Sequence, residues 1–496
     1  MELFNNKYPI YMHKGPFLND GLIYKQFGFH FAKDNWNDYG HKTSYNLKFV
    51  SKEFKIELDT SIRVTKLTDA EFEVDTINME DLMSRIVNID VVSLGNPDYY
   101  EFLNKFFNQS EKELWFKILG DLAYDKNRFE KLYSKSLDIN QTVIQNSLLR
   151  DISKSEVSNQ LHRMTRGDKF QEKYSIKLKF SDDVSLNIET DPDTNYPDNL
   201  YAIVGNNGSG KTFLIREVAK NFLLAKGEVE KDSNLLVNGD ISEFENLLFI
   251  SYSPFDERIT KNDNEVFKEI GLVNSGNKDL REVMNEEIFK AINRLGKEKR
   301  AKLHIVLEKF TFDPWFQQIS FEIQNEELKL GSNQIKLLSS GQKIILLSLV
   351  NLVLHVSEKT LVIIDEPELF LHPPLLKAYI RAVGDLVAFG NGVGLFTTHS
   401  PVVLQEIPHN CIIRTGYNAK EQKYFYKNMT TRTFGESINF INDAVFGLDL
   451  RNTGYYNLLQ KLFYEDAIDH RIENILGSEG RLLLRTLDQE RRNEED

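Results

Sequence analysis

The fold of this chain is decided by the stretch Gly205-Asn206-Asn207-Gly208-Ser209-Gly210-Lys211-Thr212, which directly follows an apolar segment at Leu200–Val204. It matches the pattern G-x-x-x-x-G-K-[ST], whose glycines let the backbone curl and point N–H groups at phosphate oxygens. Lys211 is expected to reach the β- and γ-phosphates of ATP, and Thr212 to supply a hydroxyl to Mg²⁺. A helix expected over residues 212–224 directs its positive end toward the same anion.

A second segment with chemical content is Leu361-Val362-Ile363-Ile364-Asp365-Glu366, an aliphatic strand that ends in two acids. Strands buried in parallel sheets bind ligands at their carboxyl ends, where paired carboxylates have a use. Asp365 is expected to hold Mg²⁺ through water, and Glu366 to act as the general base on the water that attacks the γ-phosphate. A strand ending in acids is common by itself, but downstream of Lys211 it is the expected partner.

A third segment, Leu338-Ser339-Ser340-Gly341-Gln342, stands at the start of an apolar helix and 22 residues before the acidic strand. Small hydroxyl groups and glycine N–H groups at a helix N-terminus suit a second phosphate contact. The simpler interpretation is an ordinary helix cap by Ser339 or Ser340. A fourth candidate, His399, ends the next apolar strand, where a lone histidine is more often structural.

The four segments cover residues 170–415 and follow one another in the order found in ABC ATPases, so this part of the chain resembles the ABC ATPases. The third resembles their L-S-G-G-Q signature, with Ser340 in place of the first glycine. The resemblance implies that residues 338–342 contact the nucleotide of the opposite subunit, so that the working site forms only when two heads meet. It also implies that His399 is the switch histidine, which donates to the γ-phosphate and orients the attacking water.

The residues after the acid pair narrow the resemblance. Asp365-Glu366-Pro367-Glu368 followed by Leu371-His372-Pro373 resembles the overcoming-lysogenization-defect and RecF/SMC-like branch, not transporter subunits. The aspartate loop of transporter subunits is missing. No glutamine stands at the turn after the strand at residues 247–250, where Ser251-Tyr252-Ser253-Pro254-Phe255-Asp256-Glu257 follows.

Strands and helices alternate over the second half of the chain, which predicts an α/β fold with a mainly parallel sheet. We expect an N-terminal α+β domain of unknown role at residues 1–168, with residues 137–169 forming helix plus linker. An ABC-type ATPase core is expected at residues 169–434, with a charged helical insertion at about 262–310 and a strand at 319–323. Residues 435–496 are expected to form a helical tail.

Composition excludes several classes of protein. Hydrophobic residues make up 41% of the chain and charged residues 27%, as in ordinary globular proteins. The single cysteine, Cys411, excludes an internal disulfide and a cysteine-based zinc site. The longest apolar run, residues 344–356, is shorter than the roughly 20 residues that span a bilayer. With no secretory signal at the N-terminus, we expect a cytoplasmic protein without membrane contact.

The expected function is an ATP-driven clamp or sensor built from a homodimer or a higher homo-oligomer. Only 127 residues separate Thr212 from Ser339, without a sustained heptad pattern, so tethering of DNA over long distances is not expected. Residues 410–496 carry no acid-rich nuclease centre. The chain thus resembles the ATPase subunits of bacterial anti-phage systems of the Septu, retron-linked and PARIS types, which implies that it controls a separately encoded nuclease or toxin.

Two alternatives remain at this point. A RecF-like repair or recombination ATPase would bind duplex DNA directly, and a scaffold would bind ATP without turnover, although intact Glu366 and His399 weigh against the latter. The net charge of −13 disfavours indiscriminate DNA binding. A local DNA contact could lie in the basic run at residues 294–302, or at Arg163, Arg166 and Lys169, but such runs are more often solvated helix faces.

Overall fold

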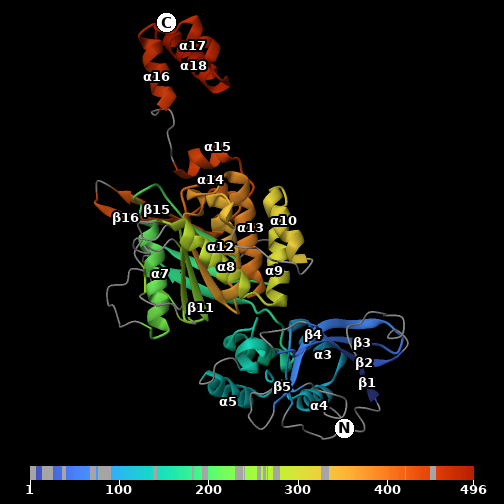
Figure 1. Ribbon diagram of the computed structural model, residues 1–496. Coiled ribbons are helices and arrows are strands. Elements are labelled where there is room, and N and C mark those ends of the chain that lie inside the picture. Colours follow the sequence, from blue (N-terminus) through green and yellow to red (C-terminus); the bar gives the residue numbers. More distant parts are fainter. Residues whose placement is uncertain are drawn as a thin grey trace.

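The computed structural model describes most of the chain, and the buried side chains of the described residues form three separate hydrophobic cores. The described residues are 7–13, 26–35, 41–67, 74–75, 91–137, 142–180, 184–192, 199–228, 238–239, 241–253, 258–260, 264, 266–271, 280–324, 335–418, 421–446 and 454–495. The first core draws on residues between Ile10 and Met164, and the second on residues between Ile176 and Phe446. Figure 1 shows the corresponding units following one another along the molecule.

The first unit combines a six-stranded sheet with helices. Its strands follow the order β1-β2-β3-β4-β5, with β6 on β4, and all pairs are antiparallel except β1–β2. The elements are β1 Ile10–His13, β2 Gly28–Lys33, β3 Ser44–Val50, β4 Ile56–Leu67, β5 Val74–Asp75, β6 Val91–Gly95, α3 Pro97–Phe106, α4 Gln109–Leu119 and α5 Lys126–Leu137. Phe29 of β2 stacks on Trp115 of α4 with ring centroids 4.3 Å apart, which joins the sheet to the helices.

Residues 142–165 belong to this first unit, so the helical part of the helix-plus-linker expectation is confirmed and the linker part is wrong over this range. They form π-helical segments at Ile144–Leu148 and Glu156–Leu161 and the short helix α6 (His162–Thr165). Ile144, Leu148 and Val157 are fully buried in the first core. The many polar residues of this stretch suggested a linker because they obscure an apolar face that only the packing reveals.

The second unit is built on a seven-stranded sheet in the order β12-β11-β13-β14-β9-β15-β16. Its strands are β9 Leu200–Val204, β11 Asn246–Ser251, β12 Phe267–Gly271, β13 Thr360–Asp365, β14 Val393–Thr398, β15 Ile412–Asn418 and β16 Lys423–Asn428. Every neighbouring pair is parallel except β15–β16. The predicted α/β class with a mainly parallel sheet is confirmed.

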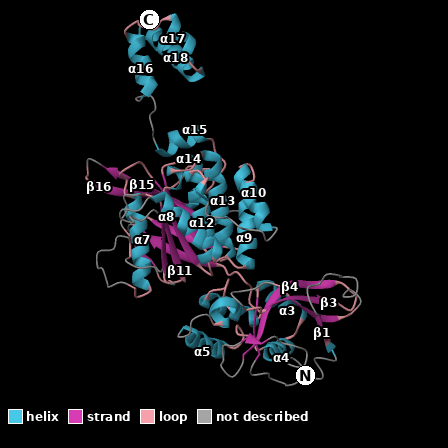
Figure 2. Cartoon of the chain, viewed as in Figure 1, coloured by secondary structure: helices cyan, strands magenta, loops and turns pink. Residues whose placement is uncertain are grey.

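Helices cover this sheet, which explains why its central strands are apolar along their whole length. β9, β13 and β14 are buried at every position. In Figure 2, α7 (Lys211–Ala225) lies to one side of the sheet, and α12 (Ser340–His355) and α13 (Pro373–Phe389) lie to the other. A strand enclosed on both faces can carry polar groups only at its ends, so the carboxyl edge is where chemistry is possible.

A second, smaller sheet packs into the same core. Strands β7 (Tyr174–Lys179) and β8 (Ser185–Thr190) form the predicted antiparallel hairpin, and β10 (Asn238–Gly239) pairs with β7. One face of this sheet packs against the core through the buried side chains of Ile176, Leu178 and Ile188.

The inserted region differs from its prediction in two places. Residues 267–271, expected to be helical, form the edge strand β12, and the expected strand at 319–323 is part of helix α10 (Pro314–Gln324). Ile319 and Ile323 are spaced by four, which fits a helix as well as a strand, and Phe316 and Ile319 are buried one helical turn apart. Between these elements lie α8 (Leu280–Asn293) and α9 (Lys297–Leu307).

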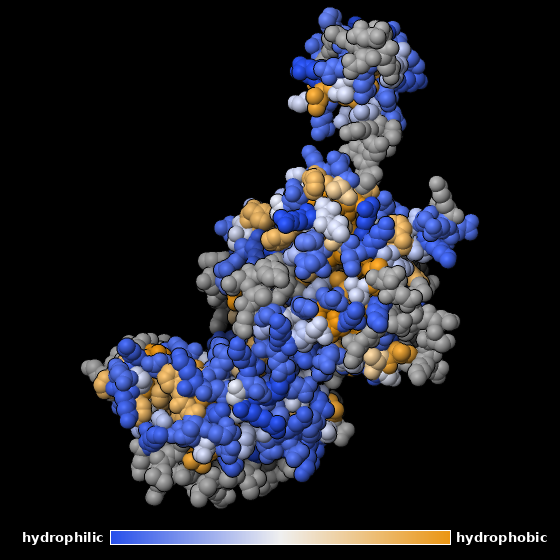
Figure 3. Space-filling view, turned by 180° about the vertical axis from the view of Figure 1, so that it is seen from behind, coloured by the Kyte–Doolittle hydropathy of each residue, from blue (hydrophilic) through white to orange (hydrophobic). Residues whose placement is uncertain are grey.

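The C-terminal part is helical. After α14 (Pro401–Leu404) and α15 (Ile438–Ile441) come α16 (Gly454–Tyr464), α17 (His470–Ile475) and α18 (Ser478–Glu495), whose small core contains Leu459, Leu483 and Leu487. Over the described ranges, no helix combines the length and apolar character needed to cross a bilayer. The face in Figure 3 is mostly hydrophilic, with scattered apolar residues.

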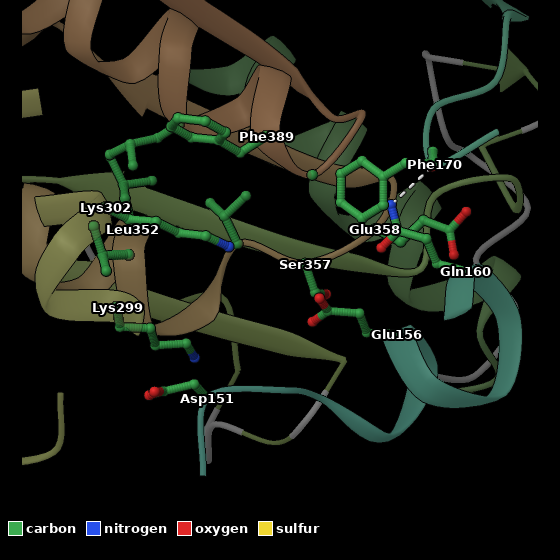
Figure 4. A pocket seen from close by; sticks show the side chains of 14 residues that line it. Asp151, Glu156, Gln160, Phe170, Lys299, Lys302, Leu352, Ser357, Glu358 and Phe389 are labelled. Atoms are coloured by element: carbon green, nitrogen blue, oxygen red, sulfur yellow. Dashed lines mark hydrogen bonds between the residues drawn. The ribbon is translucent and has the colours of Figure 1, made fainter. Parts of the chain in front are cut away.

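Charged groups line the joint between the first and second units. Asp151 of the first unit accepts a hydrogen bond from the Gly296 N–H, at the start of α9, and pairs with Arg63. Lys299 of α9 donates to the Leu354 carbonyl near the end of α12, and burial lowers its pKa. Figure 4 shows this region, with Lys299 extending from α9 toward Asp151.

The basic run at residues 294–302 is therefore largely engaged within the chain. Lys297 pairs with Asp34 at 2.6 Å, Lys299 bonds Leu354, and the Arg300 Nε donates to the Leu295 carbonyl. These contacts favour a structural role for the run over the DNA contact that the sequence left open.

Arg163, the other candidate for a DNA contact, is also engaged. Its guanidinium pairs with Glu358 at 2.6 Å and with Glu172 at 2.9 Å. The Glu358 side chain is only 2% exposed, and burial raises its pKa while Arg163 lowers it. This pair ties α6 of the first unit to the residue that precedes β13 by two positions.

We expect Arg163→Met to destabilise the chain by about 3–5 kcal/mol, because Glu358 then stays buried without its counter-ion. The double variant Arg163→Met/Glu358→Met should recover most of that loss. A carboxyl whose pKa is raised in the folded state favours folding when protonated, so its contribution falls as pH rises. The loss of unfolding free energy in Arg163→Met, measured by urea unfolding, should therefore be smaller at pH 5 than at pH 8. Equal losses in both variants at both pH values would contradict this assignment.

Candidate functional site

The glycine-rich loop at residues 205–210 lies between the end of β9 and the start of α7. Gly208 and Gly210 have φ angles of +76° and +85°, which glycine adopts without steric strain. A Cβ at Gly205 would lie 2.4 Å from Ser209 Oγ, so this turn accepts no side chain. The Thr415 hydroxyl of β15 donates to the Ser209 carbonyl at 2.8 Å and holds the loop against the sheet.

Lys211 is buried, at 4% exposure, inside the curl of this loop. Its ammonium donates to the carbonyls of Gly205 and Asn206 at 3.1 and 3.3 Å, and it forms an ion pair with Glu366 at 3.1 Å. A buried ammonium requires such partners because an unpaired charge is costly to remove from water. The lysine is thus held at the mouth of the loop.

Thr212 and Asp365 meet across the carboxyl edge of the sheet. The Thr212 hydroxyl donates to Asp365 Oδ2 at 2.9 Å, although β14 separates β9 from β13. The other carboxylate oxygen accepts a hydrogen bond from the Thr397 hydroxyl of β14. A hydroxyl and a carboxylate side by side are the ligand types that Mg²⁺ uses beside phosphates.

Glu366 has a left-handed backbone, with φ +43° and ψ +62°. Its N–H donates to the Thr397 hydroxyl at 3.1 Å, which fixes this conformation. A residue other than glycine in this region carries strain of about 1–3 kcal/mol, and such strain is concentrated at functional sites. The turn directs the Glu366 carboxylate to a position between Lys211, at 3.1 Å, and His399, whose Nδ1 lies 3.8 Å away.

His399 is held by Glu368, a residue to which the sequence analysis assigned no role. Glu368 Oε1 accepts hydrogen bonds from the Thr398 hydroxyl and the His399 N–H, both at 2.7 Å, and lies 3.2 Å from His399 Nδ1. The Glu368 side chain is 8% exposed, whereas the His399 side chain is 39% exposed. The buried carboxylate therefore orients an accessible imidazole at the edge of the site.

The segment Leu338-Ser339-Ser340-Gly341-Gln342 starts α12, as predicted. Ser339 and Gln342 form a reciprocal capping box, with the Ser339 hydroxyl accepting from the Gln342 N–H at 3.3 Å and Gln342 Oε1 accepting from the Ser339 N–H at 3.0 Å. Gln342 also donates to Asp313. Gly341 lies close to the Phe370 carbonyl, which a Cβ would approach to 3.0 Å.

The capped helix start is not bonded to the phosphate loop of its own chain. No hydrogen bond or ion pair joins residues 338–342 to residues 205–212, both of which the structure describes. Ser339 and Ser340 are exposed. Helix capping and availability to a ligand from outside are both compatible with this geometry.

The donor set fits a magnesium triphosphate. The Ser209 hydroxyl is buried without a hydrogen-bond partner, beside the loop N–H groups, and the Thr212–Asp365 pair offers hard oxygen ligands. Within the described ranges, no cluster of three or more His, Cys, Asp or Glu residues could hold a metal by itself. This agrees with Mg²⁺, which usually binds through one or two protein ligands plus phosphates and water.

Two contributors escaped the sequence analysis, Thr397 and Glu368. Thr397 is the neighbour of Asp365 in the register between β13 and β14, so its role appears only when the strand order is known. Glu368 is the last residue of the Asp365-Glu366-Pro367-Glu368 motif. Its position two residues after Glu366 could have indicated that it lies near the same site. The predicted turn after β11 extends over residues 254–257, which lie outside the described residues.

Sequence comparisons match part of the chain to a known family model. Residues 220–405 match the family model described as "AAA domain, putative AbiEii toxin, Type IV TA system". This match includes the segment 338–342, the acid pair and His399. The chain is 28% identical to protein ea59 of Escherichia phage lambda, over 92% of this chain and 93% of that protein.

Similar solved structures include ATP-binding cassettes. One is the ADP conformation of an ATP-binding cassette of an ABC transporter, with 16% identity, a TM-score of 0.27, and coverage of 51% of this chain and 93% of that one. Another is UvrA2 from Deinococcus radiodurans, with 13% identity, a TM-score of 0.28, and coverage of 53% and 38%. TM-scores this low do not by themselves define a fold. The family match, the motifs and the strand order support an ABC-like P-loop ATPase.

We expect magnesium ATP to raise the melting temperature of the chain and Lys211→Ala to abolish that rise, because the loop loses its cation. At a ligand concentration about 100 times Kd, binding adds about 2.7 kcal/mol to the free energy of unfolding. Differential scanning fluorimetry with and without nucleotide measures the shift. Lys290→Ala, on the exposed face of α8, is the matched control and should respond like the wild type. An undiminished shift in Lys211→Ala would contradict the assignment.

Proposed function

We propose that the chain is an ATP-hydrolysing enzyme of the ABC type whose complete site forms between two copies of the chain. The observation that carries this proposal is the capped start of α12, where Ser339 and Ser340 are exposed and form no hydrogen bond or ion pair with the phosphate loop of their own chain. Its serine hydroxyls and N–H groups suit phosphate oxygens, so a second head is the natural source of the nucleotide they contact.

Nucleotide binding requires an exchange of partners at Lys211. In the structure, its ammonium forms an ion pair with Glu366 and donates to two backbone carbonyls. Phosphate oxygens replace these partners, which releases the Glu366 carboxylate from the lysine. Glu366 then becomes available as general base, and its strained turn keeps it at the edge of the sheet.

The remaining residues position the reaction. His399 donates a hydrogen bond toward the γ-phosphate and orients the attacking water, and Glu368 holds it there. Mg²⁺, when bound at Thr212 and Asp365, supplies neutralisation of the phosphate charge. Hydrolysis turns one tightly held triphosphate into two products, which weakens the contact between the heads. ATP therefore closes the dimer, and its hydrolysis opens it.

The biological role that we propose is control of a separate effector, a nuclease or toxin, in defence against phages. It is supported by the toxin–antitoxin description of the matching family. A repair ATPase that binds duplex DNA is the alternative, and the engagement of Lys297, Lys299 and Arg163 within the chain disfavours it.

Affinity purification of the full chain from cells that carry its native neighbouring genes tests this role. A nuclease or toxin that co-elutes in an ATP-dependent manner would support effector control. Salt-sensitive co-elution of duplex DNA fragments, without a protein partner, would favour the repair alternative instead.

Glu366→Gln should lower ATP turnover by about 10²–10⁴-fold, because the amide cannot accept the proton of the attacking water. Since binding is retained, the variant should accumulate as an ATP-loaded dimer. Phosphate release and light scattering coupled to size exclusion measure the two effects. Glu101→Gln on α3, an exposed position, is the control. Turnover at the wild-type rate in Glu366→Gln would refute the base assignment.

Glu368→Ala should lower kcat by up to about 100-fold with little change in KM, because His399 loses its orientation while the phosphate loop stays intact. Glu368→Gln keeps one oxygen that accepts from the Thr398 hydroxyl and the His399 N–H, so it should retain more activity. Steady-state kinetics of both variants test this positioning role. A rise in KM as large as the fall in kcat would argue against it.

A further inference from the structure

A cavity of about 210 Å³ lies beside the phosphate loop, on the side away from the acids. Residues 205–209 form one wall, and the hairpin of β15 and β16 forms another through Arg414, Tyr417 and Phe425. Val445 contributes at its edge, and Asn206 Nδ2 reaches the Phe446 carbonyl at 3.5 Å. The catalytic groups described above take no part in this cavity.

The strand order sets the direction in which a nucleotide extends. Glu366 and Asp365 end β13, the phosphate loop follows β9, and β15 lies on the opposite flank of β9 from β14 and β13. The acids reach the phosphate loop from the β13 side, where the Glu366 carboxylate lies 3.1 Å from Lys211, so the reacting phosphate is expected on that side. The nucleoside at the other end of the molecule is therefore directed toward the β15–β16 hairpin.

The hairpin presents two tyrosines at this place. Tyr417 and Tyr424 are cross-strand partners with ring centroids 5.2 Å apart, and they are 49% and 50% exposed. The Tyr424 ring packs against Gly210, where a Cβ would lie 3.1 Å from the ring. Gly210 directly precedes Lys211, so an aromatic surface borders the phosphate loop itself.

A structural role explains these rings only in part. Cross-strand aromatic pairs stabilise hairpins, and tyrosine favours strands. Tyr426, two residues along the same strand, fulfils such a role by packing against Phe180 in the core. Tyr417 and Tyr424 instead leave about half of their surface to solvent. Tyr417 lines the cavity beside the phosphate loop, and Tyr424 packs against Gly210 of that loop.

Arg414 adds a positive charge to the same wall. It is the charged residue among those that line the cavity, and the described residues show no hydrogen bond or ion pair of its guanidinium. A half-buried cation without a carboxylate partner favours an anionic or aromatic ligand.

We propose that the β15–β16 hairpin is the nucleoside-binding wall of this ATPase, with the base of a purine nucleoside triphosphate stacked on Tyr424 and bordered by Tyr417. The inference rests on the proposed nucleotide site and extends it to the base. Every base has a π-face that can stack on tyrosine. We therefore expect this wall to favour a nucleotide over a phosphate chain without a base, and to discriminate little between adenine and guanine. Removal of a stacking aromatic weakens binding of a base by about 5- to 150-fold.

The test compares two ligands by isothermal titration calorimetry on the full chain, magnesium ATP and magnesium tripolyphosphate. Tyr424→Ala should lower affinity for ATP by about 10- to 100-fold and leave affinity for tripolyphosphate unchanged. Tyr424→Phe should bind ATP like the wild type. Tyr455→Ala, on α16 and equally exposed, is the matched control. GTP should bind the wild type within about tenfold of ATP.

The other outcomes separate the two proposals. If Tyr424→Ala weakens both ligands equally, Tyr424 supports the loop through Gly210 and the base wall is refuted. If it weakens neither, the base binds elsewhere and the inference is again refuted, while the ATPase proposal stands. If the wild type binds neither ligand, the proposed function itself fails.

Discussion

The ion pair between Lys211 and Glu366 is the interaction on which the rest of the site depends. A lysine 4% exposed inside a loop of backbone carbonyls needs a negative partner, and β13 supplies it at 3.1 Å. That distance exists because β14 alone separates β9 from β13, and because the left-handed turn at Glu366 bends the carboxylate toward the loop. The parallel order of three buried strands thus fixes the electrostatics of the site.

Much of the second unit could be predicted from the sequence because its signals are local. An apolar run followed directly by Gly205, or by Asp365 and Glu366, predicts a buried strand whose carboxyl end carries the functional groups. All residues of this signal lie within a few positions of one another. Thr397 and Glu368 could not be found this way, since their roles depend on which strands are neighbours. The errors at 142–165, 267–271 and 319–323 share one cause, because short segments take the conformation that their packing favours.

The β15–β16 hairpin and the acids act on opposite ends of the same ligand. β9 lies between them, so the phosphate loop is the fixed point, and the two flanks of the sheet are free to serve different purposes. The acid flank is rigid, with Thr397 bonded to both Asp365 and Glu366. The hairpin flank is an exposed edge with accessible aromatic rings, which suits recognition of a flat group more than chemistry.

Helix α12 connects the site to the first unit. Its start carries the exposed Ser339, and the Leu354 carbonyl near its end accepts a hydrogen bond from Lys299 of α9. The N–H of Gly296, at the start of α9, is held in turn by Asp151 of the first unit. In the proposed dimer, α12 provides a continuous path from Ser339 to the contact of Lys299 with Leu354. The first unit is thereby positioned to respond to events at a site that it does not touch.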